Sequence, residues 1–352
     1  MKILGIESSC DETAAAVVED GRKLLSNVVH SQIDIHAEYG GVVPEVAARS
    51  HIEVINPVIN RALSDANLTW DDIDAIAVTY APGLIGSLLV GTLATRTLAV
   101  LKNKPLYPIH HVEAHVYANF LNESAPEFPM LALIVSGGHT QLVLFKGHGD
   151  FELLGQTRDD AVGEAFDKVA KILGLPYPGG PSIAKLAQEG DPNAYQLPIS
   201  KLEGKYDFSF SGVKTAVLRA VQRAVGVDVD FPSAQLAERL DVATRANFAA
   251  SFERTAVDTL VSTTLRAYHD YSPKSVVIAG GVAANQELRK MLSKRLPITI
   301  EYAPINLCTD NAAMIATLGY YYSLRREPSD PYMLEVIPSL SMTKTAWANQ
   351  KA

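Results

Sequence analysis

Cysteine is scarce in this chain of 352 residues: it occurs only at positions 10 and 308, too few for a disulfide framework. Since the sequence shows no targeting segment, we expect a reducing, cytoplasmic location. The first apolar run is interrupted at Glu7, too early for the core of a signal peptide. Positive charge is also in deficit, with 31 Lys and Arg against 39 Asp and Glu. This balance disfavours tight unassisted binding of nucleic acid, because phosphate contacts supply most of that affinity.

Long uninterrupted hydrophobic runs are missing as well. The most apolar stretch, residues 83–101, carries Arg96 and several glycine and threonine residues. We therefore expect a helix buried between layers rather than a membrane span. The glycines of residues 279–288 form neither the dinucleotide-binding pattern nor a P-loop, so neither of these nucleotide motifs is supported.

What is present is an alternation of strand and helix patterns, which is typical of an α/β fold with a largely parallel sheet. At roughly 150 residues per domain the length suggests two domains. Two similar strand–turn–strand patterns, aligned by placing Ile6 against Val135, lie 129 residues apart and suggest two related lobes. The polar, proline-containing residues 122–129 are the expected boundary. We expect a first lobe of residues 1–125 plus about 310–330, a second lobe of 126–309, and a loosely packed tail of 331–352.

The strongest local signal is the sequence HHVEAH. On a helix, His111 and His115 lie about 40° apart and present both rings on one face, as a transition-metal site requires. Two packed histidines without a metal are an equally good interpretation of this spacing alone. Glu113 lies about 200° round the helix from His111, so the general base of an H-E-x-x-H zinc protease is missing.

A third metal ligand is available much later, at Asp310. An aspartate before an apolar helical run is more often a helix N-cap, and from the residues alone we favour the cap. Three further loops contain small or acidic residues that suit a ligand, although ordinary turns have the same composition. They hold Ser136 to Thr140 between two strands, the acidic pair Asp11 and Glu12, and the helix and loop with Asp167 and Gly180.

These segments occur together and in one order: GIESSCDETAAAVV, YGGVVPEVAARSHI, PGLIGSLLVG, HHVEAH, LIVSGGHTQLV, DDAVGEAFDKVAKILGLPYPGGP, FSFSGVKTAV, AGGVAANQELR and CTDNAAMIA. Over roughly residues 1–320 the chain resembles the TsaD family of bacterial tRNA N6-adenosine threonylcarbamoyltransferases. The resemblance implies the duplicated two-lobed superfold of actin, sugar kinases and heat-shock chaperone ATPases, with a ligand cleft between the lobes. It also implies transfer of a threonylcarbamoyl group from threonylcarbamoyl-AMP to N6 of the adenosine 3′ of the anticodon, in tRNAs that read codons beginning with A.

The same resemblance assigns residues to roles. It implies metal ligation by His111, His115 and Asp310, with iron favoured over zinc. It implies an intermediate-binding set that comprises Ile134, Val135, Ser136, Gly137, Gly138, Asp167, Gly180 and Asn285. Asp11 and Glu12 are our own hypothesis for the groups that orient or deprotonate the acceptor amine.

The resemblance also implies binding partners for this chain. The family works with a smaller TsaB-like paralogue, which pairs through the first lobe, and with a small TsaE-like ATPase, besides tRNA and threonylcarbamoyl-AMP; no membrane is implied. The alternative is an ATP-dependent small-molecule kinase or ATPase of the same superfold, which would have no need of His111 and His115.

Overall fold

The computed structural model describes residues 1–200 and 202–345. They form two compact units, each continued by distant parts of the chain. Among the described residues, the first unit comprises 1–127, 145–151 and 301–345, and the second comprises 128–144, 152–200 and 202–300. The change from one unit to the other after residue 127 lies within the polar segment 122–129.

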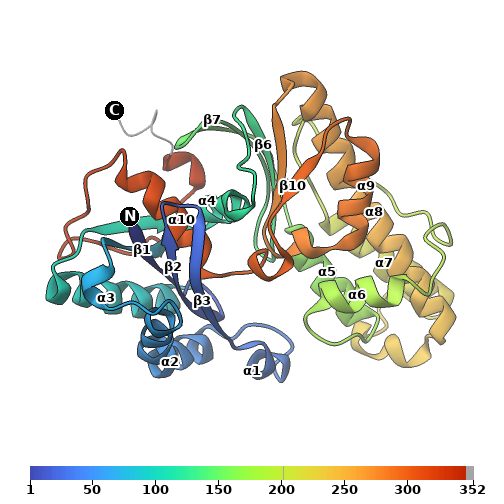
Figure 1. Ribbon diagram of the computed structural model, residues 1–352. Coiled ribbons are helices and arrows are strands. Elements are labelled where there is room, and N and C mark those ends of the chain that lie inside the picture. Colours follow the sequence, from blue (N-terminus) through green and yellow to red (C-terminus); the bar gives the residue numbers. More distant parts are fainter. Residues whose placement is uncertain (201, 346–352) are drawn as a thin grey trace. The chain divides into compact units, whose positions relative to one another are not determined.

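The first unit contains a five-stranded sheet in the order β3-β2-β1-β4-β5 (Figure 1). Its strands are β1 (Lys2–Glu7), β2 (Glu12–Glu19), β3 (Lys23–Ser31), β4 (Ala75–Ala81) and β5 (Leu106–His110). Its helices are α1 (Ile33–Ala37), α2 (Pro44–Asp65), α3 (Ile85–Lys102), α4 (His111–Tyr117) and α10 (Ala312–Ser323). Strands β1, β2, β4 and β5 are mostly apolar and buried, as expected for a sheet covered by helices, whereas the edge strand β3 is largely exposed.

A second five-stranded sheet, most of whose residues belong to the second unit, has the order β10-β9-β6-β7-β8. Its strands are β6 (Met130–Val135), β7 (Thr140–Gly147), β8 (Asp150–Gln156), β9 (Ser275–Ala279) and β10 (Ile300–Tyr302). The helices of the second unit are α5 (Val162–Ile172), α6 (Gly179–Ala187), α7 (Ser211–Ala224), α8 (Val242–Tyr271) and α9 (Gln286–Arg295). Short 3₁₀ turns occur at Trp70–Asp72, Ala118–Leu121, Ser233–Gln235, Ala237–Arg239, Gly281–Ala284, Ile305–Leu307 and Met342–Lys344.

The two sheets repeat one topology. In the first, β1 pairs antiparallel with β2 and parallel with β4; in the second, β6 lies between β7 and its parallel partner β9. The strand–turn–strand similarity seen in the sequence therefore reflects two copies of the same arrangement. This duplicated α/β arrangement agrees with the two-lobed fold that the resemblance implies.

Helix α3 is less buried than the sequence predicts. By length and composition this helix of 18 residues is apolar enough to cross a membrane, yet only 33% of it is buried inside the protein. Leu88 packs in the core, while Ile85, Leu89 and Leu93 are 60%, 50% and 64% exposed. The prediction of a helix buried between layers is therefore wrong: mean hydropathy counts apolar residues without showing how many faces of the helix are covered.

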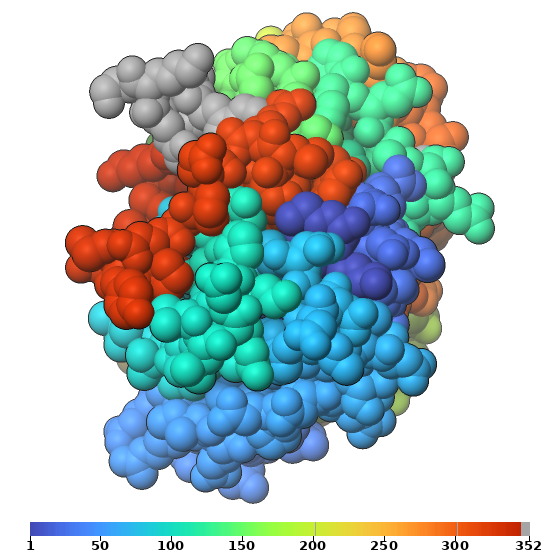
Figure 2. All heavy atoms as spheres, turned by 60° about the vertical axis from the view of Figure 1, so that its left-hand side comes forward, coloured from blue at the N-terminus to red at the C-terminus, as the bar shows by residue number. Residues whose placement is uncertain are grey.

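The carboxy-terminal segment 331–345 is also unlike the loose tail that we expected. Leu334 and Met342 are buried, and Arg96 of α3 donates hydrogen bonds to the carbonyls of residues 331, 332 and 334. His110 Nε2 lies 3.0 Å from the carbonyl oxygen of Leu340. Figure 2 shows this red segment along the surface beside the teal residues that precede α4. Side chains from elsewhere hold the segment, which is why no periodicity marks it; residues 346–352 of the expected tail lie outside the described residues.

Candidate functional site

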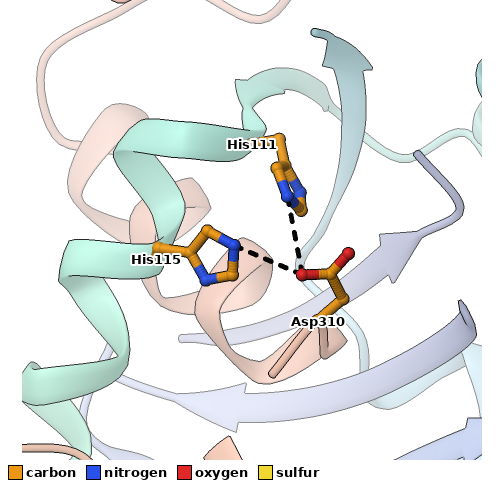
Figure 3. Close-up of side chains that lie close together, drawn as sticks. All are labelled: His111, His115 and Asp310. Carbon is orange, nitrogen blue, oxygen red and sulfur yellow. Dashed lines mark ion pairs between the residues drawn. The ribbon is translucent and has the colours of Figure 1, made fainter. Parts of the chain in front are cut away.

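Helix α4 brings the two histidines together at the end of β5. His111 is its first residue and His115 lies one turn later, so both rings project from one face (Figure 3). The ring centroids are 4.6 Å apart with an edge-to-face inclination, and both side chains are buried. The helical spacing of HHVEAH thus has the predicted geometric result.

Asp310 reaches the histidines from the loop before α10. Its Oδ1 lies 3.2 Å from His115 Nε2 and 3.6 Å from His111 Nε2, as Figure 3 shows. Asp310 is not the N-cap of α10, as the residues alone had favoured. Asn311 is the cap, and its side-chain oxygen accepts a hydrogen bond from the backbone N–H of Met314. Because the neighbouring asparagine caps the helix, the Asp310 carboxylate is directed to the histidines.

The three residues offer a donor set that fits a divalent metal ion. One ligand atom from each of His111, His115 and Asp310 lies within 4.8 Å of the others. Among the described residues, Nδ1 of buried His115 has no hydrogen-bond partner, and Nε2 makes no hydrogen bond beyond its 3.2 Å ion-pair contact with Asp310. Such an orphaned imidazole is costly in a protein interior unless another group completes it. Two imidazoles and a carboxylate are suitable ligands for iron or zinc.

Glu113 takes no part in this cluster. Its carboxylate accepts hydrogen bonds from the hydroxyls of Tyr322, at 2.8 Å, and Thr345, at 3.2 Å. Burial raises the pKa of Glu113 to about 7 despite these bonds. The side chain thus faces away from the histidines, as its helical position predicts, and anchors the carboxy-terminal segment on α4.

A second carboxylate, Glu7, stands behind His111. Its Oε2 lies 3.0 Å from His111 Nδ1, and Thr79 donates a hydrogen bond of 2.6 Å to the same oxygen. Burial alone would raise the pKa of Glu7, but the charge and hydrogen bond of His111 outweigh it and hold the pKa below its usual value. Conversely, burial would lower the pKa of His111, whereas Asp310 and Glu7 raise it to about 9.

The acidic pair Asp11 and Glu12 lies at the β1–β2 turn of the same unit. Asp11 is buried and Glu12 partly so, and Ser31 Oγ lies 3.4 Å from Glu12 Oε1. Burial, then the charges of Asp310 and Asp11, raise the pKa of Glu12 to about 10. Burial and Asp11 also raise the pKa of Cys10, a free thiol. Cys10 therefore has no thiolate character that would suit a covalent nucleophile.

The predicted intermediate-binding residues all lie in the second unit. Ile134 and Val135 end the buried strand β6, and Gly137 and Gly138 are exposed in the following turn. Ser136 closes the turn by donating its N–H to the carbonyl of His139, while its Oγ accepts the His139 N–H. Among the described residues, no atom lies within 4 Å of a Cβ built on either glycine. The backbone of this turn is thus accessible to a ligand.

Two further glycines pack against this turn. A Cβ on Gly163, in the first turn of α5, would lie 2.6 Å from the carbonyl oxygen of Ser136. A Cβ on Gly280, after β9, would collide with the carbonyl oxygen of Val135, and its φ of +91° also disfavours a side chain. Only glycine at both positions lets α5 and the β9–α9 connection meet the end of β6.

Asp167 of α5 contacts Gly179, the first residue of α6, and Gly180 follows it in the chain. Asp167 Oδ1 accepts a hydrogen bond of 2.7 Å from the N–H of Gly179. Burial raises the pKa of Asp167, although this hydrogen bond partly offsets the effect. A Cβ on Gly180 would have open space around it, with no described atom within 4 Å. Gly180 therefore leaves room beside the start of α6.

Both the oxygen and the nitrogen of the Asn285 side-chain amide are hydrogen-bonded. The oxygen accepts from the N–H of Leu288 and so caps α9, while the amide nitrogen donates 2.7 Å to Glu253 of α8. Glu253 is buried, and burial raises its pKa. The orientation of the Asn285 amide is thereby set.

Sequence reasoning missed the residues that support the predicted ones. Glu7, Thr79, Gly163 and Glu253 were not singled out for any site. For Glu7 there was a signal: a charged residue directly follows the apolar run of residues 3–6 in a strand, where a buried ionisable group is rare without a partner. Glu253 lies in the middle of a long helix with nothing local to distinguish it.

Solved structures of low sequence identity have the same fold. HypF from T. kodakarensis matches with a TM-score of 0.58 at 14% identity, over 95% of this chain and 49% of that chain. Component A of (R)-2-hydroxyglutaryl-CoA dehydratase from Acidaminococcus fermentans matches with a TM-score of 0.50 at 15% identity, over 92% of this chain and 100% of that chain. These likenesses concern the fold alone.

Other proteins have a much higher sequence identity to this chain. Residues 23–317 match the profile of the family TsaD, described as tRNA N6-adenosine threonylcarbamoyltransferase. Proteins with that name include one from Dehalococcoides mccartyi, 51% identical over 97% of this chain and 100% of the relative. Another, from Symbiobacterium thermophilum, is 54% identical over 91% of each chain. With this extent of similarity, the chain belongs to the TsaD family of tRNA N6-adenosine threonylcarbamoyltransferases and is a transferase.

Proposed function

We propose that this protein transfers the threonylcarbamoyl group of threonylcarbamoyl-AMP to N6 of the adenosine 3′ of the anticodon, in tRNAs that read codons beginning with A. The observation that carries the proposal is the cluster of His111, His115 and Asp310 in a chain of this family. A kinase of the same superfold would have no use for it. Release of AMP and formation of the modified adenosine would complete the reaction in the cytoplasm, where tRNA is found.

The reaction makes modest demands on the protein. The donor is a mixed carbamic–phosphoric anhydride and is already activated, while the acceptor is an aromatic amine of low basicity. Positioning the two and stabilising negative charge on the carbonyl or the departing phosphate are the main requirements. A divalent ion, iron by preference and zinc as the alternative, would be held by His111, His115 and Asp310 and would supply a Lewis acid.

The second unit would hold the intermediate. The accessible backbone of Gly137 and Gly138 suits the phosphate and acyl region, because exposed amides at a glycine turn bind anions. Ile134, Val135 and Ser136 form the strand end that presents this turn. Asp167, Gly180 and Asn285 would bind the adenylate part, and the bond from Asn285 to Glu253 supports this role by fixing one amide orientation.

Asp11 and Glu12 are proposed to handle the amine proton. Burial and the charges of Asp310 and Asp11 raise the pKa of Glu12, an effect that a cation bound at Asp310 would oppose. Either Asp11 or Glu12 would therefore orient the amine or accept its proton. No covalent intermediate on the protein is needed.

The partners follow from the family and from one surface. The α3 stripe is defined here as Ile85, Leu89 and Leu93, exposed at intervals of one helical turn. We propose that this stripe, with Ile52 of the neighbouring α2, binds a smaller TsaB-like paralogue, since exposed apolar stripes of this kind mark protein interfaces. A small TsaE-like ATPase would act on that complex, and tRNA would bind to the assembly, which compensates for the net charge of −8.

The test is a single-turnover assay with the purified chain, its paralogue, threonylcarbamoyl-AMP and unmodified tRNA, with nucleosides analysed by mass spectrometry. We expect modified adenosine with the intact chain and none with His111→Ala. A parallel reaction with ATP and small-molecule acceptors tests the kinase alternative. Absence of product from a folded, metal-loaded complex, together with ATP consumption, would overturn the proposal in favour of the kinase.

A further inference from the structure

A buried carboxylate lies directly behind one of the candidate metal ligands. Glu7 is the last residue of β1, and its side chain is fully buried. An ionisable group is costly in such a place unless it is paired and hydrogen-bonded. A strand that needed only to fill the core would carry an apolar residue here, so the carboxylate calls for a specific explanation.

Both oxygens of Glu7 have defined partners. Oε1 accepts a hydrogen bond of 2.5 Å from the backbone N–H of Ser9. Oε2 accepts one of 2.6 Å from the hydroxyl of Thr79 and lies 3.0 Å from His111 Nδ1. A carboxylate can only accept, so the hydrogen between Glu7 and His111 belongs to the imidazole.

This arrangement decides which nitrogen of His111 is available. With its hydrogen on Nδ1, the neutral ring has its lone pair on Nε2, which lies 3.6 Å from Asp310 Oδ1. Nε2 is therefore the atom that faces the other two donors. Metal-bound histidines generally donate their second N–H to a carboxylate or carbonyl in this way.

We propose that Glu7 is a positioning residue that keeps the hydrogen of His111 on Nδ1 and so makes Nε2 a metal ligand. The inference rests on the proposed metal site at His111, His115 and Asp310 and assigns a role to a residue outside it. His115 has no comparable support, since its Nδ1 has no hydrogen-bond partner among residues 1–200 and 202–345. His111 is thus the ligand whose geometry is fixed before any ion arrives.

Glu7→Gln gives a nearly isosteric test, because an amide cannot satisfy all of these partners. If the glutamine oxygen takes the place of Oε2, the amide NH₂ takes the place of Oε1 and faces the N–H of Ser9, so that two donors meet. With the amide turned over, its NH₂ would donate to Thr79 and His111, which moves the imidazole hydrogen to Nε2. We expect zinc affinity, measured by competition with a chelator, to fall about 10- to 100-fold.

A second readout concerns the protein without metal. Nitrogen-15 NMR of the imidazole rings, at a pH where His111 is neutral, distinguishes the two positions of its hydrogen. We expect Nδ1–H in the native chain and a shift toward Nε2–H in Glu7→Gln. Glu253→Gln is the matched control, since it neutralises a buried carboxylate in the other compact unit and should leave zinc affinity unchanged.

The outcomes separate this inference from the metal site itself. If the native chain binds zinc no more tightly than His111→Ala, the metal site fails. If the native chain binds zinc and the zinc affinity of Glu7→Gln is within about 3-fold of the native value, the role of Glu7 is overturned while the metal site stands. Should Glu7→Gln fail to fold, an Nε2–H imidazole in the native chain would still contradict the inference.

Discussion

Asn311 and Asp310 are adjacent in the chain but have separate functions: Asn311 caps α10, whereas Asp310 lies 3.2 Å from His115. We therefore expect their substitutions to have different effects. Asn311→Ala should destabilise the protein by about 1 kcal/mol through loss of the cap. Asp310→Asn should leave the cap intact and abolish tight metal binding. Thermal unfolding and metal content of both variants test this, and equal destabilisation by both would contradict the separation.

His148 should make the stability of the protein depend on pH. It stacks on Tyr321 at 3.9 Å, and Tyr117 Oη lies 3.1 Å from its Nδ1. Burial, then the charge of Arg325, lower the pKa of His148 to about 4. An unfolded histidine titrates near 6.5, so the unfolded state takes up the proton first. Stability is complete above about pH 6.5 and declines as the pH falls toward 4, by about 1–2 kcal/mol after allowance for partial exposure.

The matched variant for this prediction is His148→Phe, which keeps an aromatic ring against Tyr321. Denaturant unfolding of both proteins at pH 7 and pH 5 gives two differences in free energy. We expect the smaller difference in His148→Phe, because other groups titrate in both proteins and cancel. Identical differences would show that His148 is not the group responsible.

The glycines of the second unit should divide into two classes. Gly163→Ala and Gly280→Ala place a Cβ against the carbonyl oxygens of Ser136 and Val135, so both should destabilise the fold by about 2 kcal/mol or more. Gly180→Ala has open space and should fold normally. Its methyl group would instead weaken binding of AMP, as measured by calorimetry. Normal AMP affinity in Gly180→Ala would remove Gly180 from the proposed adenylate set.

Glu253 should matter for nucleotide affinity through Asn285. Glu253→Ala removes the acceptor of the Asn285 amide, and we expect AMP to bind about 10-fold more weakly, a loss typical of one hydrogen bond. Glu253→Gln retains an acceptor oxygen and should restore most of the affinity. If Gln and Ala were equally weak, a fixed Asn285 orientation would not be the reason.

The carboxy-terminal segment should contribute to both stability and metal affinity. A chain that ends after residue 330 loses buried Leu334 and Met342 and also Thr345, a partner of Glu113 on α4. We expect a loss of about 3 kcal/mol or more in unfolding free energy, with weaker zinc binding. A chain that ends after residue 345 keeps every contact described here and serves as the control. Unchanged zinc affinity in the shorter chain would show that α4 is held without this segment.

The sequence allowed some of these features to be predicted because their causes are local. The placement of His111 and His115 follows from helical periodicity, and the alternation of strands and helices follows from apolar patterning. The family resemblance, rather than any spacing, connected Asp310 to the histidines. From the residues alone Asp310 looked like a cap, because aspartate and asparagine are equally good N-caps and either neighbour could have taken that position.

Other features depend on contacts between distant residues and could not be predicted in this way. Arg96 and His110 hold the carboxy-terminal segment by its backbone carbonyls, which no side-chain pattern records. The exposed face of α3 has the same composition as a buried one. The role that we infer for Glu7 requires knowledge that His111, 104 residues later, ends beside it.

The position of Asp310 in the chain has a consequence for biosynthesis. His111 and His115 leave the ribosome long before Asp310, and the segment that packs on α4 through Glu113 is made later still. No nascent or prematurely terminated chain that stops short of residue 310 contains all three donors. The proposed three-ligand site can therefore be complete only in chains that have been synthesised beyond residue 310.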